Sequence, residues 1–349
     1  MADYFCFDKR KVVVGISGGV DSAVCAYLLK QQGYDVYGVT MITFDNPDYI
    51  EDAKSVCELL NIKFDTVDMR KEFKENIIDN FVSEYLKGRT PNPCTRCNPM
   101  VKFESLIRYA DSIGAFYIAT GHYALIEKCN GRFSVKNSVT ALKDQTYALC
   151  NLSQSVLERT LMPIGEYDKQ FVRKTASDIG LSVANKPDSQ DICFVENDYA
   201  QYINSIGHSK DLPGNFVDMK GNIIGKHEGI THYTIGQRKG LNLSMGHPVF
   251  VVKIDALKNE VVIGESEDLF SDECILKDIN YMSKSTDFED GIELTVKIRY
   301  AHKGTAAKVY HVDDNRLKVV FIEKVRAITP GQTAVLYDGD FVFAGAVIE

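Results

Sequence analysis

The sequence lacks an apolar run long enough to span a bilayer, and residues 1–10 are too few and too polar for a signal peptide. It also lacks an excess of positive charge, since its 349 residues carry a formal net charge of −8. This balance excludes a protein coated with cations for non-specific nucleic-acid binding, although a local basic patch could still hold an RNA. Long repeats and low-complexity segments are absent too. We expect a cytoplasmic globular protein with no membrane partner.

The cysteines are scattered and odd in number, with nine positions from Cys6 to Cys274. This pattern does not fit the disulfide framework of a small secreted protein. Cys94 and Cys97 form a Cys-x2-Cys pair, but the second pair that a structural zinc site would need is missing. In a reducing cytosol each cysteine is therefore a buried small residue, a metal ligand or a reactive thiol.

The most informative stretch is residues 15–22, which read Gly-Ile-Ser-Gly-Gly-Val-Asp-Ser. The apolar, β-branched run before it, residues 11–14, predicts a buried parallel strand, and residues 23–30 favour a helix. Two adjacent glycines lack Cβ atoms where the strand turns into the helix, so the backbone N–H groups of the turn can approach a ligand closely. Because the helix start adds a partial positive charge, phosphate is the ligand that such a turn binds best.

The spacing of this turn matches neither the dinucleotide pattern Gly-x-Gly-x-x-Gly nor the Walker pattern, which ends in Gly-Lys-[Ser/Thr]. It resembles the Ser-Gly-Gly-x-Asp-Ser signature of the PP-loop ATP pyrophosphatases. That resemblance implies an enzyme that splits ATP between its α and β phosphates and transfers AMP to a carbonyl oxygen. The alternative is a Gly-Gly turn that only connects a strand to a helix.

Strand-like and helix-like segments alternate from residue 11 to residue 120. Strands are expected at 11–14, 35–41, 63–67 and 115–120, and helices at 23–30, 50–60, 72–87 and 103–113. This alternation predicts an α/β fold, a doubly wound parallel sheet with helices on both faces. Ligands of such sheets bind beyond the carboxyl ends of the strands, so Gly15, Met41 and Gly121 should converge on one nucleotide site.

The later part of the chain has a different texture. Residues 133–141 and helical stretches at 153–161 and 169–179 continue the first domain to about residue 202. Glycines and short β-type runs are frequent from 214 to 264, and strands of period two follow from about residue 272. We predict a catalytic domain at 1–202, a small central linker domain at 203–270 and a C-terminal β-barrel at 271–349.

Residues 88–98 contain two prolines and are predicted to form a rigid loop rather than a helix or strand. The loop carries Cys94 and Cys97, and Arg89 and Arg96 lie near them in the sequence, where cations favour the thiolate. Cys193 lies farther along the chain and, taken alone, is typical of a core cysteine.

Several motifs together resemble the tRNA-specific 2-thiouridylase family and occur in one order from about residue 11 to residue 349. They are Ser-Gly-Gly-Val-Asp-Ser at 17–22, Gly-Arg-Thr-Pro-Asn-Pro-x3-Cys-Asn at 88–98, Ala-Thr-Gly-His-Tyr at 119–123, Lys-Asp-Gln-Thr-Tyr at 143–147, Asp-Ser-Gln-Asp-Ile-Cys-Phe at 188–194, Thr-Ile-Gly-Gln-Arg-Lys-Gly at 234–240 and Thr-Pro-Gly-Gln at 329–332.

This resemblance implies a reaction on the anticodon of a tRNA. ATP, with Mg²⁺, activates the C2 oxygen of the wobble uridine as an adenylate, and sulfur then replaces that oxygen. Cys193 matches the cysteine that receives a persulfide from a sulfur-donor protein. Cys97 matches the nucleophile, which releases sulfide from that persulfide as the two cysteines form a transient disulfide. The fold must then bring these two residues together.

The resemblance also implies a set of binding positions. The ATP contacts would be Gly15, Ile16, Ser17, Gly18, Gly19, Val20, Asp21, Ser22, Met41 and Gly121. The target base would contact Asn92, Pro93 and Cys94. The tRNA would contact the central domain and His122, Lys143, Asp144, Gln145, Arg299, Tyr300 and Gln332.

One position departs from the family pattern, because Cys94 stands where the family commonly has Asp. An Asp there could donate or accept a proton near the base, whereas a thiol is a poorer acid and a better metal ligand. An alternative is therefore that Cys94, Cys97 and Cys193 hold an iron–sulfur cluster with one open iron. Two further alternatives are a PP-loop ligase that adenylates a different carbonyl and a nucleotide-binding redox sensor without catalytic activity.

Overall fold

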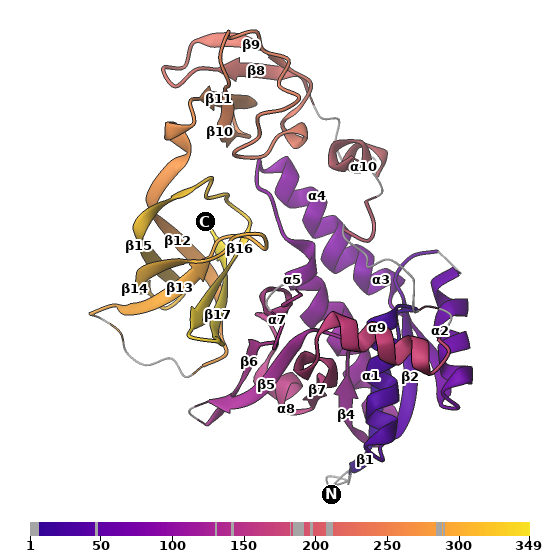
Figure 1. Ribbon diagram of the computed structural model, residues 1–349. Helices are drawn as coiled ribbons and strands as arrows, with labels where there is room; N and C mark the ends of the chain where they lie inside the picture. The colour runs from indigo at the N-terminus through magenta and orange to yellow at the C-terminus, as the bar shows by residue number, and fades with distance from the viewer. Residues whose placement is uncertain are drawn as a thin grey trace, which may run out of the picture.

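The computed structural model describes residues 7–45, 48–129, 131–140, 143–181, 183, 192–195, 198–206, 212–283, 288 and 290–349. Figure 1 shows a helix-covered sheet near the N-terminus, a small sheet at the top of the view and a barrel that ends at the C-terminus. Within the described ranges, no helix combines the length and the hydropathy that crossing a bilayer requires.

The N-terminal region is built on a five-stranded sheet whose neighbouring strands are all parallel, in the order β3-β2-β1-β4-β7. Its strands are β1 (Asp8–Gly15), β2 (Asp35–Ile42), β3 (Lys63–Asp68), β4 (Ala115–Ala119) and β7 (Thr160–Leu161). The first four agree with the predicted strands. The helix predicted for 153–161 is wrong at its end: the helix there stops at Glu158, and Thr160 pairs with Ile118 of β4.

Helices cover both faces of this sheet, which confirms the doubly wound prediction. On one face, α1 (Val20–Gln31), α2 (Asp48–Leu59) and α9 (Lys169–Asp178) enclose a core with Val12 and Val14. On the other face, α6 (Glu104–Ser112) packs in a core with Val13. Because successive side chains of a strand point to opposite faces, a strand that is buried on both sides has to be apolar throughout.

A second group of helices connects the sheet to the rest of the molecule. The helical segment α3 (Arg70–Phe73), η1 (Lys74–Ile78) and α4 (Asp79–Leu86) runs from the sheet towards the small central sheet (Figure 1). Against α4 packs α10 (Tyr199–Ser205), where Ile203 joins Phe81 and Tyr85 in one apolar cluster. The predicted domain boundary at residue 202 therefore falls inside α10. The remaining short helices are α5 (Pro93–Cys97), η2 (Asn98–Phe103), α7 (Thr146–Leu149), α8 (Gln154–Glu158) and η3 (Pro163–Glu166).

The central region holds a four-stranded sheet in the order β10-β11-β8-β9. Its elements are β8 (Gly214–Val217), β9 (Ile223–His227), η5 (Ile230–His232), β10 (Phe250–Asp255), β11 (Glu260–Gly264) and η6 (Glu267–Leu269). Phe216, Val251 and Val261 lie in its separate apolar core. This core contains side chains from β8, β10 and β11.

The C-terminal region is a closed six-stranded barrel, as predicted. Its strands are β12 (Phe270–Tyr281), β13 (Ile292–Lys297), β14 (Thr305–Asp313), β15 (Arg316–Arg326), β16 (Thr333–Asp338) and β17 (Phe341–Ile348), and β12 pairs with β17 to close it. Residues 133–141 were expected to continue the first domain, and the hairpin of β5 (Ala124–Cys129) and β6 (Arg132–Asn137) includes part of them. Its strand β6 also pairs with β17 through Lys136 and Phe341, so the hairpin extends the barrel sheet.

Candidate active site

The nucleotide loop, residues 15–22, turns from the end of β1 into α1. Gly18 has a φ of 70°, and Gly19 is the N-cap of α1 in an extended conformation, without a side-chain cap. The Ser22 hydroxyl accepts a hydrogen bond from the Ser17 amide (3.1 Å) and donates one to the Gly19 carbonyl (3.1 Å). These bonds fix the turn from within, while uncapped N–H groups at the start of α1 remain available to an anion.

Two glycines are required here because other backbone lies against them. A Cβ on Gly18 would come within 2.8 Å of the Tyr49 carbonyl oxygen, and its φ already disfavours a side chain. A Cβ on Gly121, just after β4, would come within 2.6 Å of the Asp21 carbonyl carbon and the Ser22 nitrogen. Met41 Cε lies 3.8 Å from where a Cβ of Gly15 would be. The structure thus brings Gly15, Met41 and Gly121 together around the loop.

The carboxylate of Asp21 is neutralised by a residue that the sequence did not single out. Lys169 Nζ, on α9, lies 2.7 and 2.8 Å from the two Asp21 oxygens, and the Tyr123 hydroxyl donates to Asp21 Oδ1 at 2.8 Å. The ion pair is largely shielded from water, with side chains 14% and 28% exposed. It removes the negative charge that would otherwise repel a phosphate at this turn. The 148 positions between the partners explain why no local pattern revealed it.

The cysteine loop, residues 88–98, is only partly a loop. The prediction of no regular structure is wrong for Pro93–Cys97, which form α5. Asn92 is its N-cap and accepts a hydrogen bond from the Cys94 amide (3.0 Å), and Pro93 occupies the first turn, where its missing N–H costs nothing. Pro93, one of the two prolines that suggested a loop, is therefore part of the start signal of a helix.

The barrel holds the cysteine loop in place. Gln332 Nε2 donates to the Thr90 carbonyl (2.9 Å), and the Thr90 amide donates to the Pro330 carbonyl (2.9 Å). The hydroxyls of Thr95 and Thr333 are 2.7 Å apart and buried. The domain with the nucleotide loop and the barrel therefore meet at the cysteine loop.

The structure brings Cys94, Cys97 and Cys193 into one neighbourhood. Cys97 packs against an apolar cluster that includes Phe73 and also contacts Phe194, the neighbour of Cys193. Burial is the main cause that raises the pKa of Cys97 to about 12; Lys102 acts against it, and Cys193 and Cys94 add to it by charge repulsion. All three thiols are free. Cys97 and Cys193 thus lie close enough for their charges to interact, and the disulfide exchange between them stays a prediction.

The cation near the thiols is not the predicted one. Arg89 forms an ion pair with Glu84 (2.8 Å), and Arg96 Nε donates to the Asn76 carbonyl (2.7 Å). Lys102 on η2 instead lowers the pKa of Cys97 and Cys193, although burial outweighs it at both. The prediction that Arg89 and Arg96 favour the thiolate is therefore wrong, because both side chains bind other groups and Lys102 is the cation that acts on the thiols.

Among the residues that the structure describes, no group of three or more His, Cys, Asp or Glu side chains is arranged to hold a metal ion. Cys94, Cys97 and Cys193 belong to the residues searched. The geometry gives no support to the alternative in which these thiols ligate an iron–sulfur cluster.

Comparison with known proteins places the chain. Residues 10–197 match a family model described as tRNA methyl transferase HUP domain, 200–265 its PRC-barrel domain, and 271–348 an aminomethyltransferase beta-barrel domain. The tRNA-specific 2-thiouridylase MnmA of Clostridioides difficile is 50% identical, with 98% of this chain and 99% of that protein covered. That of Lachnoclostridium phytofermentans is 52% identical over 97% and 99%. The chain belongs to the tRNA-specific 2-thiouridylase family.

A more distant resemblance is to a solved 4-thiouridine synthetase–RNA complex with bound ATP, at 19% identity and a TM-score of 0.36. It covers 53% of this chain and 44% of that one.

Several positions at which this family was expected to contact tRNA are occupied by internal bonds. The carboxylate of Asp144 accepts hydrogen bonds from the backbone amides of Ser138 (3.0 Å) and Thr146 (3.1 Å). Gln145 Oε1 accepts one from the Tyr123 amide (2.9 Å). The backbone amide of Lys143 donates to the Thr140 carbonyl (3.3 Å). These bonds shape the segment around His122, and tRNA contacts of these residues stay predictions.

On the barrel, Arg299 Nη1 donates to the carbonyls of Arg326 (3.1 Å) and Ala327 (3.3 Å), and burial lowers its pKa. Tyr300 is 56% exposed and meets the Tyr147 ring edge-on, with centroids 5.8 Å apart. Burial raises the pKa of Tyr147, and a side-chain hydrogen bond with Asn92 of the cysteine loop acts to lower it. Tyr300 is thus an exposed aromatic side chain close to the expected base contact.

His122 lies half-buried between the two loops. Its ring stacks on Phe103 with centroids 6.0 Å apart, and its Nδ1 is 2.8 Å from the Thr120 hydroxyl. Burial, and then the charge of Lys102, lower the pKa of His122 to about 3. The imidazole is therefore neutral at physiological pH, so it would contact RNA as a stacking or hydrogen-bonding group rather than as a cation.

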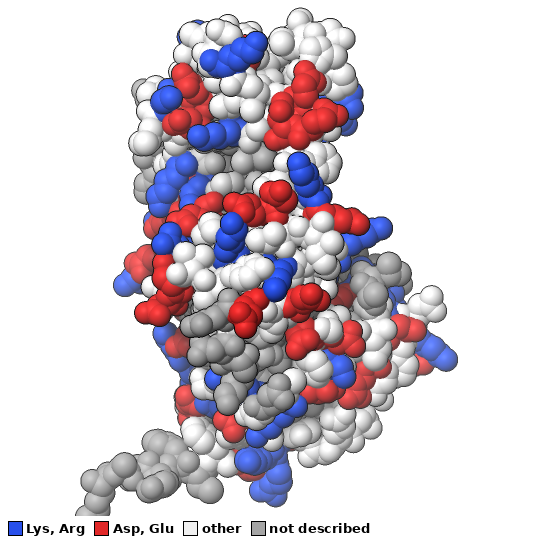
Figure 2. All heavy atoms as spheres, turned by 90° about the vertical axis from the view of Figure 1, so that its left-hand side faces the viewer, with Lys and Arg blue, Asp and Glu red and all other residues white. Residues whose placement is uncertain are grey.

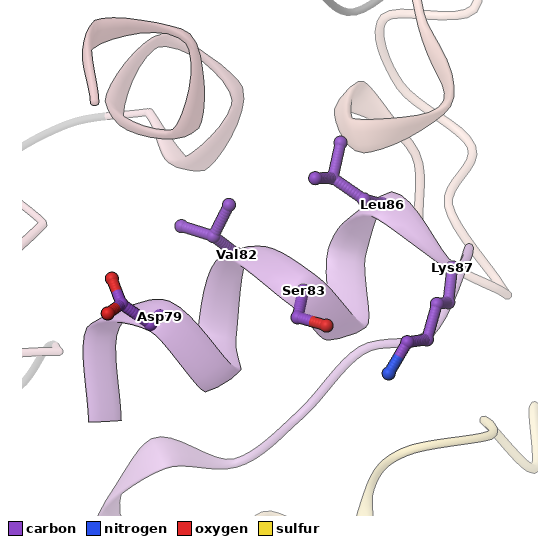
Figure 3. A pocket seen from close by; sticks show the side chains of 5 residues that line it. All are labelled: Asp79, Val82, Ser83, Leu86 and Lys87. Atoms are coloured by element: carbon purple, nitrogen blue, oxygen red, sulfur yellow. The ribbon is translucent and has the colours of Figure 1, made fainter. Parts of the chain in front are cut away.

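The surface carries mixed charges on the face of the barrel (Figure 2) and a groove along α4. Figure 2 shows Lys and Arg interspersed with Asp and Glu over the face that carries the barrel, without a continuous basic field. Figure 3 shows a groove of about 340 Å³ along α4, lined by Asp79, Val82, Ser83, Leu86 and Lys87. Burial, and then the charges of Cys193 and Asp79, raise the pKa of Tyr202. The residues of the groove are ordinary for one face of a helix, so no pattern in the sequence predicted it.

Proposed function

We propose that the chain is an ATP-dependent enzyme that converts the wobble uridine of a tRNA anticodon to 2-thiouridine; its relatives are named tRNA-specific 2-thiouridylases. The observation that carries this proposal is the shared border of the two loops. Gly121 packs against the nucleotide loop, and the next residue, His122, stacks on Phe103 of the helical segment that follows Cys97. A base activated at one loop would therefore be within reach of sulfur from the other.

The first step would be adenylation. A uracil carbonyl is a poor electrophile, so its oxygen must first become part of a good leaving group. ATP would bind with its phosphates at the start of α1, and attack of the C2 oxygen on the α phosphate would release pyrophosphate. Mg²⁺, when bound, would neutralise the phosphate charge. Since Asp21 is already paired with Lys169, phosphate oxygens and water would supply most of the ligands of the ion, as Mg²⁺ prefers.

The second step would be sulfur transfer. A persulfide-carrying donor protein would load Cys193 as Cys193–S–SH. The Cys97 thiolate would attack the inner sulfur, so that a Cys97–Cys193 disulfide forms and HS⁻ leaves. Sulfide would then attack C2 of the adenylated base and displace AMP. The disulfide is the oxidised product of this exchange, and an external dithiol would reduce it before the next turnover. This requirement is our reason for proposing a cytoplasmic location.

Cys94 would have a narrower role than the Asp that the family commonly has there. Burial raises the pKa of Cys94 above its ordinary value, so its sulfur is protonated at neutral pH. It can donate a proton near the base but cannot accept one, and we propose that proton acceptance falls to water or to the leaving AMP.

The proposal is tested by nucleoside mass spectrometry of tRNA incubated with the enzyme, ATP, Mg²⁺ and a protein persulfide. We expect wild type to form 2-thiouridine, and Cys97→Ser and Cys193→Ser to lose at least about 100-fold of it, because no residual thiol exchange is possible. Free sulfide should restore product in both variants, since it bypasses the exchange. Cys129→Ser, which removes a half-buried thiol from β5, is the matched control and should behave as wild type.

Each alternative predicts a different outcome. Full product from Cys193→Ser with persulfide would favour a ligase that has no use for the cysteine pair. ATP binding without pyrophosphate release in the presence of tRNA would favour a nucleotide-dependent sensor. Product that needs stoichiometric iron and Cys94 even with sulfide would favour a cluster.

A further inference from the structure

Lys102 lies on η2, five residues after Cys97, in the helical segment that continues α5. In a regular α-helix, side chains five positions apart are rotated by about 140° from each other, because each residue advances about 100°. The segment Asn98–Phe103 is instead a π-helix that begins directly after Cys97, and its hydrogen bonds join residues five positions apart. This register returns Lys102 to the face of the helix that carries Cys97.

The surroundings of Lys102 are thiols and a neutral ring. Its charge acts on Cys94, Cys97, Cys193 and His122, which come from three separate parts of the chain. The next residue, Phe103, is fully buried and stacks on His122, which holds the segment in position. Lys102 itself is only partly exposed, and within the described ranges no carboxylate forms an ion pair with it.

The other charged groups near the thiols do not compete for this role. Arg89 is paired with Glu84, and Arg96 donates to the Asn76 carbonyl. His122 is neutral at physiological pH. The elements that pack around Cys97, at Met69, Phe73, Ile77 and Val101, contribute apolar side chains. Of the described residues, Lys102 is therefore the one whose positive charge reaches all three sulfurs.

We propose that Lys102 is the counter-charge of the sulfur exchange: its ammonium group stabilises the Cys97 thiolate before attack and the hydrosulfide that leaves. This inference rests on the proposed function. In the exchange, Cys97–S⁻ and Cys193–S–SH give Cys97–S–S–Cys193 and HS⁻, so one negative charge moves between sulfurs while no proton is gained or lost. A single fixed cation beside both positions stabilises reactant and product anions alike. Without it, an apolar pocket would have to hold an uncompensated anion.

A competing role for Lys102 would be to bind the phosphates of ATP. The nucleotide loop already has the uncapped start of α1 for that purpose, and its own carboxylate is neutralised by Lys169. The thiol site has no comparable device. Lys102 is therefore assigned to the sulfurs rather than to the nucleotide.

The test is the pH dependence of thiol alkylation in the intact, tRNA-free enzyme, read at each cysteine by peptide mass spectrometry with iodoacetamide. Lys102→Met should move the Cys97 profile about one pH unit upward, so that its alkylation rate at a fixed lower pH falls about tenfold. Lys102→Arg keeps the charge and should recover most of the rate. Lys136→Met removes a lysine of β6 that pairs with Glu127, and it should leave the profile unchanged.

Two internal readouts protect the interpretation. Cys25 and Cys150 are fully buried, so their alkylation would reveal unfolding; in that event Lys102→Gln replaces the Met variant. An unchanged Cys97 profile in a folded variant would overturn the inference, most clearly if ATP affinity fell at least about fivefold instead. The assay needs neither tRNA nor a sulfur donor. Failure of wild type to make 2-thiouridine would overturn the proposed function, whereas a normal profile in Lys102→Met would overturn this inference alone.

Discussion

The backbone of the nucleotide loop is fixed by hydrogen bonds between neighbours in the sequence, whereas the cysteine loop is fixed by bonds to residues far away in the chain. Within the nucleotide loop, the hydrogen bonds of Ser22 reach five and three positions back. The cysteine loop is fixed by bonds that span 238 positions to Thr333, 242 to Gln332 and 259 to Ile348. The backbone conformation of the nucleotide loop is therefore determined within one short motif. The cysteine loop takes its conformation only when the barrel has closed and packed against it.

This contrast has a functional consequence. The nucleotide loop should keep its shape whenever its own domain is folded, whereas the cysteine loop should depend on the barrel as well. Mutations are therefore expected to separate ATP binding from sulfur transfer. A change at the nucleotide loop should impair ATP binding, and a change at the contact between the barrel and the cysteine loop should impair sulfur transfer alone.

The largest effect is expected for Gly121→Ala. The new Cβ would come within 2.6 Å of the backbone of Asp21 and Ser22, and backbone cannot move aside as a flexible side chain could. Overpacking of this kind costs about 1–3 kcal/mol, and we expect ATP affinity to fall about tenfold or more, measured by calorimetry. Gly33→Ala is the control, because nothing lies near that glycine; it should lower stability slightly through its φ of 89° and leave ATP affinity intact. Equal affinity in both variants would contradict the packing argument.

A smaller effect, on sulfur transfer rather than on ATP binding, is expected for Thr333→Val. Thr95 donates its hydroxyl proton to the Asn92 carbonyl (3.0 Å), so the buried Thr333 hydroxyl must be the donor in the pair with Thr95. Its loss leaves an unpaired acceptor, at a cost of about 1–2 kcal/mol. We expect 2-thiouridine formation to fall several-fold while ATP affinity stays as in wild type. Thr295→Val, at an exposed position of β13, is the control. A parallel loss of ATP binding would show that the loops are not independent.

How much could be predicted follows the same division. The order of β1 to β4 and the barrel were predictable because each strand carries its own apolar pattern, as Val12, Val13 and Val14 do on two faces. The pairing of the hairpin β5–β6 with the barrel was not predictable, because Lys136 and Phe341, which join the two, lie far apart in the chain. Lys169 was missed for the same reason.

Lys102 was missed in the sequence for a different reason, which is the helical register. Five residues from Cys97 is an unfavourable spacing for contact in an α-helix, and only the π register of η2 makes it favourable. No residue type in η2 predicts a π-helical hydrogen-bond pattern. The cysteine loop itself was assigned as irregular because its prolines were counted as breakers, although Pro93 stands at a position that starts a helix.

The smallest predicted effect concerns His122, which borders both loops. Its pKa is lowered from 6.5 to about 3 in the folded state, mainly by burial, so the unfolded chain binds a proton that the folded one excludes. The free energy of unfolding should therefore decrease as pH falls below about 6.5, and full stability should be present above it. Between pH 7 and pH 5 we expect wild type to lose about 1 kcal/mol more than His122→Gln in urea denaturation, a value discounted because the ring is only half-buried. If the free energy of unfolding had the same pH dependence in wild type and in His122→Gln, the imidazole would be charged or exposed in solution. ATP affinity and thiol alkylation measured on the same variant would then tell whether the border contact matters to one loop or to both.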